Sequence, residues 1–188
     1  MSMPRLILLL VAAVASLGIS ARAETPVASV AELDLGRYVG KWYEIASFPM
    51  FFQRQCIGDT TAEYGLTPEG RVSVTNRCRT DSGFDQATGE ASVVEGSRNA
   101  RLKVSFFWPF RSDYWVVGLD ADYRWAVVGN PNRKYLWVLS RTPQLPQNQL
   151  DAALKAAATQ GFDLMQLRYT VQGDPGKAPQ ALLAPRPE

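Results

Sequence analysis

The side chains that most often perform catalysis are scarce in this chain, which has no His and only two Cys, Cys56 and Cys78. Ser-His-Asp and Cys-His catalysis and histidine-ligated zinc or haem are therefore excluded. Two thiolates are also too few for a zinc site. The sequence contains no G-x-S-x-G elbow, P-loop or G-x-G-x-x-G turn. We therefore predict a protein that is not an enzyme, with no catalytic residue, no cofactor and no metal.

Two carboxylates, Asp120 and Asp122, are close enough in sequence to be considered as an acid–base pair. They lie between two strand-like segments, and Asp in such a position is typical of turns. We interpret them as solvated turn carboxylates. A lipocalin-type enzyme is kept as the lesser alternative for the function of the chain.

The two cysteines lie on either side of a turn signal, Thr67-Pro68-Glu69-Gly70, and a hairpin there would bring them into one neighbourhood. Cysteine pairs in exported proteins usually form disulfides, because the compartment is oxidising. Cys56 lies further from the turn than Cys78 does, so the pairing needs a bulge or an irregular strand. We predict a disulfide, and two free, buried thiols are the alternative.

The first residues have the pattern of a targeting segment. Arg5 precedes an apolar run over residues 6–17, and Ala21-Arg22-Ala23 is the small-x-small pattern that a signal peptidase accepts. The alternative is a retained membrane anchor. The run is shorter than the ~20 apolar residues of a comfortable membrane span, which argues against an anchor. Residues 1–23 are therefore predicted to be a signal peptide. Because no Cys lies beside the cleavage site, we expect an exported, periplasmic protein that is not lipidated.

The remaining sequence is long enough for a single domain with a sizeable core, over residues 24–172. Residues 173–188 hold four Pro and little apolar surface, so we expect a disordered, Pro-rich tail. The formal charge of +2 arises from Arg5 and Arg22 in the predicted signal peptide, and the rest of the chain is balanced. No run of Lys and Arg is present, and we expect no binding to nucleic acid.

Short β-prone segments separated by turn signals make up most of the domain. They are residues 40–48, 57–66, 71–79, 86–94, 100–107, 114–119, 123–128 and 135–140. Many short strands without intervening helices predict an all-β sandwich or an up-and-down barrel. The pattern changes at Gln147–Thr159, where apolar residues recur at helical spacing until Gly161. A final strand could lie at residues 162–171.

One predicted strand shows how a barrel could hold a ligand. Leu102, Val104 and Phe106 alternate with polar residues, as in a strand with one face toward an interior. The chain also has five Trp, seven Tyr and eight Phe, which is more than a filled core requires. Aromatic and apolar walls suit an apolar ligand. For any single aromatic residue, packing in the core or at the rim is the alternative.

Three short motifs resemble those of the lipocalin family. Gly40 and Trp42 belong to a G-x-W sequence like the one that opens the first lipocalin strand. Asp122-Tyr123 is similar to the second conserved region, with Ala121 in place of its usual Thr. Residues 136–141 resemble the third region and end in Arg141. Order and spacing agree, and the resemblance covers residues 35–171.

The resemblance implies an eight-stranded antiparallel up-and-down lipocalin barrel, closed at one end, with one C-terminal α-helix packed alongside. It assigns Trp42 and Arg141 a structural role at the closed end. A guanidinium over an indole contributes about 0.5–2 kcal/mol. Neither residue is expected to contact a ligand.

Within the family, the chain resembles the bacterial lipocalin Blc and apolipoprotein D-like lipocalins, through residues 41–46, 102–107, 109–110 and 135–143. This resemblance implies that the barrel binds a fatty acid or lysophospholipid, for storage, maintenance or repair of cell-envelope lipids. It also implies peripheral contact with the outer membrane and a monomer or homodimer. Blc-type proteins are commonly outer-membrane lipoproteins, and the absence of a lipidation Cys here favours a soluble periplasmic member.

The apolar face of each predicted strand supplies the expected ligand-binding residues. They are Phe48, Tyr64, Val104, Phe106, Trp108, Tyr114, Val116 and Trp137. A slip of one residue in register would move several of them to the outer face. The polar head of a ligand would stay at the rim, beside Arg111 or Lys134.

The apolar loop Met50-Phe51-Phe52 supports a different hypothesis, in which the chain is a protein-interaction module with this loop as its exposed anchor. The alternative is that the loop caps the mouth of the barrel.

Overall fold

The computed structural model describes residues 25–173. The predicted signal peptide, and the predicted tail after Gly173, lie outside the described residues. The strands are β1 (Gly40–Ser47), β2 (Gly58–Leu66), β3 (Val72–Thr80), β4 (Gly83–Val93), β5 (Arg101–Phe107), β6 (Phe110–Leu119), β7 (Trp125–Gly129), β8 (Leu136–Ser140) and β9 (Arg168–Tyr169). The helices are α1 (Leu35–Tyr38) and α2 (Gln147–Thr159), with 3-10 turns η1 (Phe51–Gln53) and η2 (Leu164–Gln166). Within residues 25–173, no helix has the length and apolar character needed to cross a membrane.

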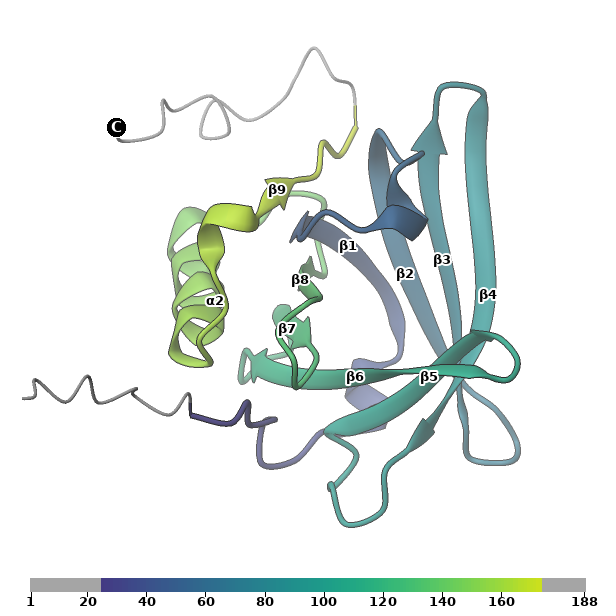
Figure 1. Cartoon of the computed structure of the whole chain (residues 1–188), viewed down its shortest axis with the longest axis vertical. Coiled ribbons are helices and arrows are strands. Elements are labelled where there is room, and N and C mark those ends of the chain that lie inside the picture. The colour runs from purple at the N-terminus through teal and green to yellow at the C-terminus, as the bar shows by residue number, and fades with distance from the viewer. Residues whose placement is uncertain (1–24, 174–188) are drawn as a thin grey trace, which may run out of the picture.

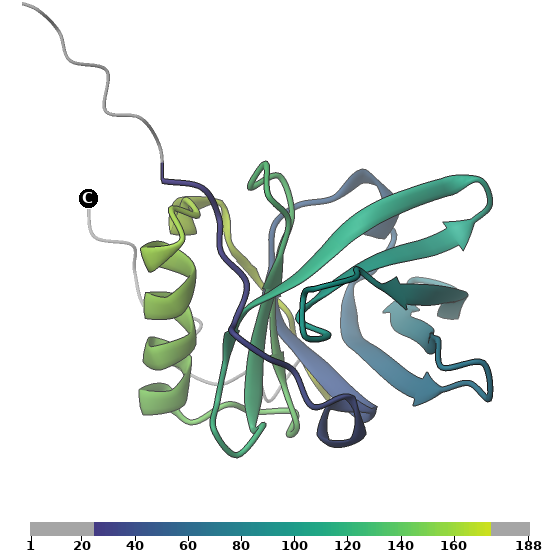
Figure 2. The ribbon, with the colours of Figure 1, turned by 90° about the horizontal axis from the view of Figure 1, so that it is seen from below.

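Consecutive strands pair antiparallel from β1 to β8, and β8 pairs back with β1. The sheet is therefore a closed eight-stranded up-and-down barrel, to which the short β9 is added beside the end of β1. Figures 1 and 2 show the barrel with α2 lying against one side of it. The predicted all-β lipocalin barrel with one C-terminal helix is confirmed.

Helix α2 has the bounds that the apolar spacing predicts, and it packs on β6 and β7. Leu150, Ala153 and Ala157 are its buried residues, and their spacing places them on one face. The helix lies close to the barrel wall because the facing residues on α2 and β6 are small. A Cβ atom at Gly118 of β6 would lie 2.7 Å from the Cβ atom of Ala156. The helix thus closes a second apolar cluster on the outside of the barrel.

One end of the barrel is closed around Arg141, whose guanidinium carbon lies 3.8 Å from the ring centre of Trp42. The indole is fully buried, and its nitrogen donates to the carbonyl of Tyr38 at 2.8 Å. The same guanidinium donates to the carbonyls of Arg37, Tyr38, Val39 and Lys41 at 2.5–3.2 Å. One cation therefore joins α1 to the start of β1 and covers the floor of the barrel.

The other signature residues lie at the same end. The Tyr123 hydroxyl accepts from the backbone nitrogen of Asp34 at 2.9 Å, and the Arg37 guanidinium lies 4.1 Å from its ring centre. The Asp34 carboxylate in turn caps α1 by accepting from the Arg37 nitrogen. Gly40 has φ +92°, in the left-handed region that favours glycine. The three motifs that resemble the lipocalin signature therefore meet in space.

The interpretation of Asp120 and Asp122 as two solvated carboxylates is wrong for Asp120. The Asp120 side chain is 10% exposed, whereas that of Asp122 is 74% exposed. Asp120 accepts two bonds from the Arg124 guanidinium and two from backbone nitrogens of the turn. The hydrogen bond from Arg124 holds the pKa of Asp120 below its usual range. This carboxylate is therefore a fixed acceptor that orders the β6–β7 turn.

Two predicted segments differ most from the structure. Residues 109–113 were expected to be a connection, but β6 already begins at Phe110, and only Trp108 and Pro109 separate it from β5. In place of a long final strand at residues 162–171, the chain forms η2 and the two-residue β9. Phe162 is buried against Phe48, with ring centres 6.2 Å apart. The start of this segment therefore packs on the outside of the barrel and does not pair in the sheet.

Replacing Arg141 with Lys should lower the free energy of unfolding by about 2 kcal/mol, because one ammonium cannot serve four carbonyls and cover an indole. Urea unfolding followed by circular dichroism measures the loss. Arg101→Lys is the matched control, since Arg101 is exposed and lies over the Trp115 ring at 4.7 Å. The control should lose about 0.5 kcal/mol. Equal losses in the two variants would contradict the special role of Arg141.

Candidate ligand-binding site

The barrel encloses a cavity of about 440 Å³, a volume within the range of small-molecule sites. Inward-facing side chains from the strands, and the segments that join them, form its lining. The floor includes Tyr38, Tyr64, Leu102, Tyr114 and Leu139, the walls include Val72, Val74, Ala91, Val104 and Val128, and the mouth includes Phe51, Phe52, Phe106, Phe107, Phe110, Tyr135 and Trp137. Most of these side chains are apolar or aromatic, so the cavity suits an apolar guest.

Five of the expected ligand-binding residues lie together in this cavity. They are Tyr64, Val104, Phe106, Tyr114 and Trp137. Strand alternation explains their position, since each belongs to the inward-facing set of β2, β5, β6 or β8. That these side chains contact a bound molecule remains a prediction.

The other three expected residues do not line the cavity. Trp108 is 80% exposed at the tip of the β5–β6 hairpin. Val116 is fully buried in the inner core. Phe48 lies in the apolar cluster between the barrel and α2.

An irregularity in β1 explains the position of Phe48. The register of β1 against β8 shifts between Glu44 and Ala46, which inserts one residue and reverses the alternation beyond it. Ile45, Ala46 and Phe48 consequently pack in the outer cluster. Glu44 keeps the inward position that follows Trp42, and its side chain lines the cavity.

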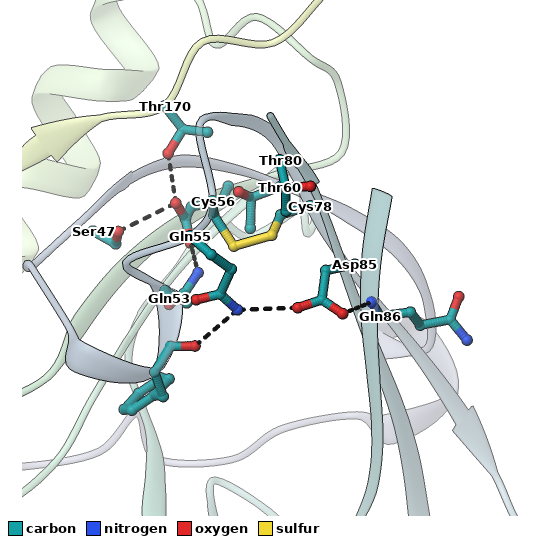
Figure 3. Close-up of a disulfide and its surroundings, with 12 residues drawn as sticks. Ser47, Gln53, Gln55, Cys56, Thr60, Cys78, Thr80, Asp85, Gln86 and Thr170 are labelled. Carbon is teal, nitrogen blue, oxygen red and sulfur yellow. Dashed lines mark hydrogen bonds between the residues drawn. A yellow bond between two sulfur atoms is a disulfide. The ribbon is translucent and has the colours of Figure 1, made fainter. Parts of the chain in front are cut away.

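Glu44 is a functional candidate that sequence analysis missed. Its carboxylate is buried and accepts from Ser47 Oγ at 3.2 Å, from Gln53 Nε2 at 3.0 Å and from Thr170 Oγ1. Gln53 also accepts from Trp137 Nε1 at 3.2 Å. Figure 3 shows Ser47, Gln53 and Thr170 converging from three separate segments. A charged residue two positions after an inward-facing Trp was the available signal, since strand alternation directs it inward.

Burial raises the pKa of the Glu44 carboxyl, and the hydrogen bonds from Thr170, Gln53 and Ser47 oppose that effect in decreasing order. Desolvation has the larger influence because it penalises the charged form of a buried group. The group therefore takes up a proton more readily than an exposed Glu does. It links the mouth turn η1, through Gln53, to the wall of the cavity.

Three tyrosines form a polar cluster at the floor. The Tyr38 and Tyr114 hydroxyls lie 2.7 Å apart, and Tyr114 donates to Tyr64 at 2.8 Å. Burial raises the pKa of Tyr64 to about 12, and it also raises the pKa of Tyr38 and Tyr114. The cluster is therefore a neutral set of hydroxyl groups at ordinary pH.

The predicted disulfide joins Cys56 to Cys78 and ties the η1 loop to β3. The expected irregularity is present, because the register of β2 against β3 shifts between Gly58 and Thr61. Figure 3 shows the bond and the neighbouring contact in which Gln55 Nε2 donates to Asp85 at 3.1 Å. The mouth is thus fixed on the β3–β4 side by a covalent bond and a hydrogen bond.

Aromatic side chains surround the mouth and remain open to solvent. Phe51 and Phe107 are each 75% exposed, Trp108 is 80% and Phe110 is 71%. Phe107 and Phe110 are stacked across the β5–β6 hairpin, with ring centres 6.5 Å apart. Exposed apolar groups that gather in this way mark contact surfaces. Within residues 25–173, no three His, Cys, Asp or Glu side chains are grouped as metal ligands would be.

The model of the lipocalin-like domain family matches residues 33–172 of the chain. The chain belongs to the lipocalin family. It is 39% identical over 174 residues to the outer membrane lipoprotein Blc of Escherichia coli (strain K12), covering 89% of this chain and 98% of that protein. It is 38% identical over 157 residues to the temperature-induced lipocalin-1 of Arabidopsis thaliana, covering 76% of this chain and 81% of that protein.

The fold comparison agrees with this assignment. Insecticyanin from the tobacco hornworm, Manduca sexta, has a similar structure with a TM-score of 0.65 and 20% sequence identity. The match covers 81% of this lipocalin and 87% of insecticyanin. Apolipoprotein D of Macaca fascicularis is 33% identical over 148 residues, covering 74% of this chain and 77% of that protein. The resemblance to Blc-type and apolipoprotein D-like lipocalins that the motifs indicate is therefore confirmed.

Glu44→Gln should stabilise this lipocalin increasingly as the pH rises. Below the ordinary Glu pKa of 4.5, the carboxyl is protonated in folded and unfolded chains, and the two proteins should differ little. Because the folded pKa is raised, the wild type loses stability as the pH rises through it, and the neutral amide does not. Thermal unfolding from about pH 4 to about pH 8 measures the difference, with exposed Glu63→Gln as the control. A difference that is constant with pH would contradict the buried-carboxyl account.

Proposed function

We propose that this lipocalin binds a fatty acid or lysophospholipid in its barrel and sequesters or transports it without a covalent step. Lipocalins as a family bind small hydrophobic ligands. The observation that carries the proposal is the apolar cavity of about 440 Å³ that opens at an aromatic mouth and ends at a covered floor. An acyl chain entering it would leave water and contact the side chains of Val104, Phe106 and Trp137.

In this proposal, the burial of the apolar acyl chain supplies most of the binding free energy. Each methylene group that leaves water contributes roughly 0.8 kcal/mol, so chain length should control affinity. A charged head group would stay at the rim, because burying an ion without a partner is costly. Arg111 and Lys134 are exposed at the mouth end of their segments, and Arg77 lies in the cavity lining. These cations would favour a carboxylate or phosphate there.

The proposed setting is the cell envelope, where the protein would store, maintain or repair lipids. The relatives named outer membrane lipoprotein support export. Both Cys residues of this chain are joined in the disulfide, so neither thiol is free to carry a lipid. We propose a periplasmic protein whose exposed Phe107, Trp108 and Phe110 touch the outer membrane peripherally. Trp at a membrane interface is favourable because its apolar ring and polar nitrogen suit that region.

The interaction-module hypothesis is less well supported. Met50 is buried and only 7% exposed, so the Met50-Phe51-Phe52 loop offers two exposed apolar side chains instead of three. Both rings line the cavity, and Phe52 packs on Tyr135 with ring centres 5.7 Å apart. This arrangement favours the alternative in which the loop caps the mouth.

In a series of saturated fatty acids, affinity should rise about fourfold for each added methylene until the cavity is filled. Isothermal titration of the purified protein measures the series. Val104→Trp should weaken long-chain binding at least tenfold because the indole occupies the cavity. Lys103→Trp, on the outward face of the same strand, is the matched control and should leave binding unchanged. Octanoate that binds as tightly as oleate would show the mechanism to be wrong.

A further inference from the structure

We propose that the tyrosine cluster, Tyr38, Tyr64 and Tyr114, is a polar subsite for an uncharged oxygen at the buried end of the ligand. The preferred guest would then be an acyl chain that carries a keto or hydroxyl group near its far end, and not a plain hydrocarbon chain. This inference rests on the proposed function and narrows its ligand class.

Counting the hydroxyl protons shows that one donor is unused. Three hydroxyl groups carry three protons, and two hydrogen bonds join them. Because Tyr114 donates its single proton to Tyr64, Tyr38 must donate to Tyr114. The Tyr64 proton then has no acceptor in the cluster, and none is found elsewhere among residues 25–173. A buried donor without an acceptor is unfavourable and calls for a partner.

The unused donor belongs to the cavity. Tyr64 is 8% exposed, and it lines the cavity together with Tyr38 and Tyr114. The rings of Tyr38 and Tyr64 have centres 5.4 Å apart, and those of Tyr64 and Tyr114 are 6.0 Å apart. The three rings therefore support one another and hold the hydroxyl groups in place. A preorganised donor of this kind binds an acceptor without having to be ordered first.

The depth of the subsite determines where the oxygen must lie on the ligand. Tyr114 is four residues along β6 from Phe110 at the mouth, which is about 13 Å of extended strand. An oxygen that reaches the cluster must therefore lie far from a head group held at the rim. A long chain with polar groups at both ends satisfies both regions.

The cluster favours a neutral oxygen over a carboxylate. Its hydroxyl groups are neutral, since burial keeps the pKa of Tyr64 high, at about 12. The Arg141 guanidinium at this end is already engaged with four carbonyls and the Trp42 ring. A carboxylate on the floor would thus be a buried ion without a free cation beside it, which is costly. A ketone or an alcohol avoids that cost and still accepts the proton.

The test compares hexadecanoic acid with its penultimate-keto and terminal-hydroxy derivatives, by isothermal titration of the full chain. In the wild type the oxygenated acids should bind at least as tightly as the plain acid, although their oxygen leaves water. In the triple variant Tyr38→Phe/Tyr64→Phe/Tyr114→Phe, the affinity ratio of keto to plain acid should fall about tenfold. Tyr43→Phe, outside the cavity on β1, is the matched control and should leave the ratio unchanged.

A spectroscopic measurement keeps the test decisive if the triple variant does not fold. The infrared carbonyl stretch of the bound ketone in the wild type should lie below its value in alkane solution, because a hydrogen bond weakens the C=O bond. A stretch at the alkane value would overturn the proposal. A keto-to-plain ratio that is equal in the wild type and a folded triple variant would also overturn it.

Two further results separate this inference from the proposed function. If all the acids bind but tyrosine replacement weakens the plain acid and not its methyl ester, the carboxyl group itself occupies the floor, and the inference fails alone. If none of the acids binds the wild type, the proposed function fails and the inference fails with it.

Discussion

The contact between Arg141 and Trp42 is the interaction on which the rest of the barrel depends. An eight-stranded barrel has an interior that side chains can just fill or that can hold one small ligand. Here the filled end is the one under the guanidinium, where the Trp42 indole is fully buried. Because the same cation binds four carbonyls before and after the start of β1, the floor is held together without relying on the loops at the mouth.

Small side chains create the space above that floor. Ala62 and Ala91 occupy inward positions on β2 and β4, where a larger residue would fill the interior. The cavity is therefore a consequence of volume along the strands, since a protein interior packs closely unless small residues prevent it. Apolar clusters on both faces of the β6–β8 wall, one inside the barrel and one beneath α2, keep this part rigid while the opposite hairpins form the mouth.

The sequence predicted most elements because period and turn chemistry are local properties. Helix α2 matches its predicted bounds, and each of the eight barrel strands overlaps a predicted segment, although β4 and β6 begin earlier than the turn signals place them. The cavity residues were predicted less well, because a one-residue bulge reverses the inward face. The shift after Glu44 moves Phe48 to the outer cluster. Alternation also could not reveal that Tyr38, on a short helix before the barrel, joins Tyr64 and Tyr114, since that contact depends on the closed end.

Selectivity in such a cavity depends more on its few polar groups than on its apolar walls. Apolar walls distinguish two acyl chains by about 0.8 kcal/mol of binding free energy for each methylene by which their lengths differ. They do not distinguish acyl chains of equal volume. A buried polar group distinguishes them by the cost of remaining unpaired, about 1–3 kcal/mol. The Glu44 carboxylate already accepts hydrogen bonds from three donors within the protein, so it does not require a hydrogen-bond partner on the ligand. The tyrosine cluster has one proton more than its hydrogen bonds use, and this excess makes the floor, rather than the wall, the part of the cavity that can discriminate.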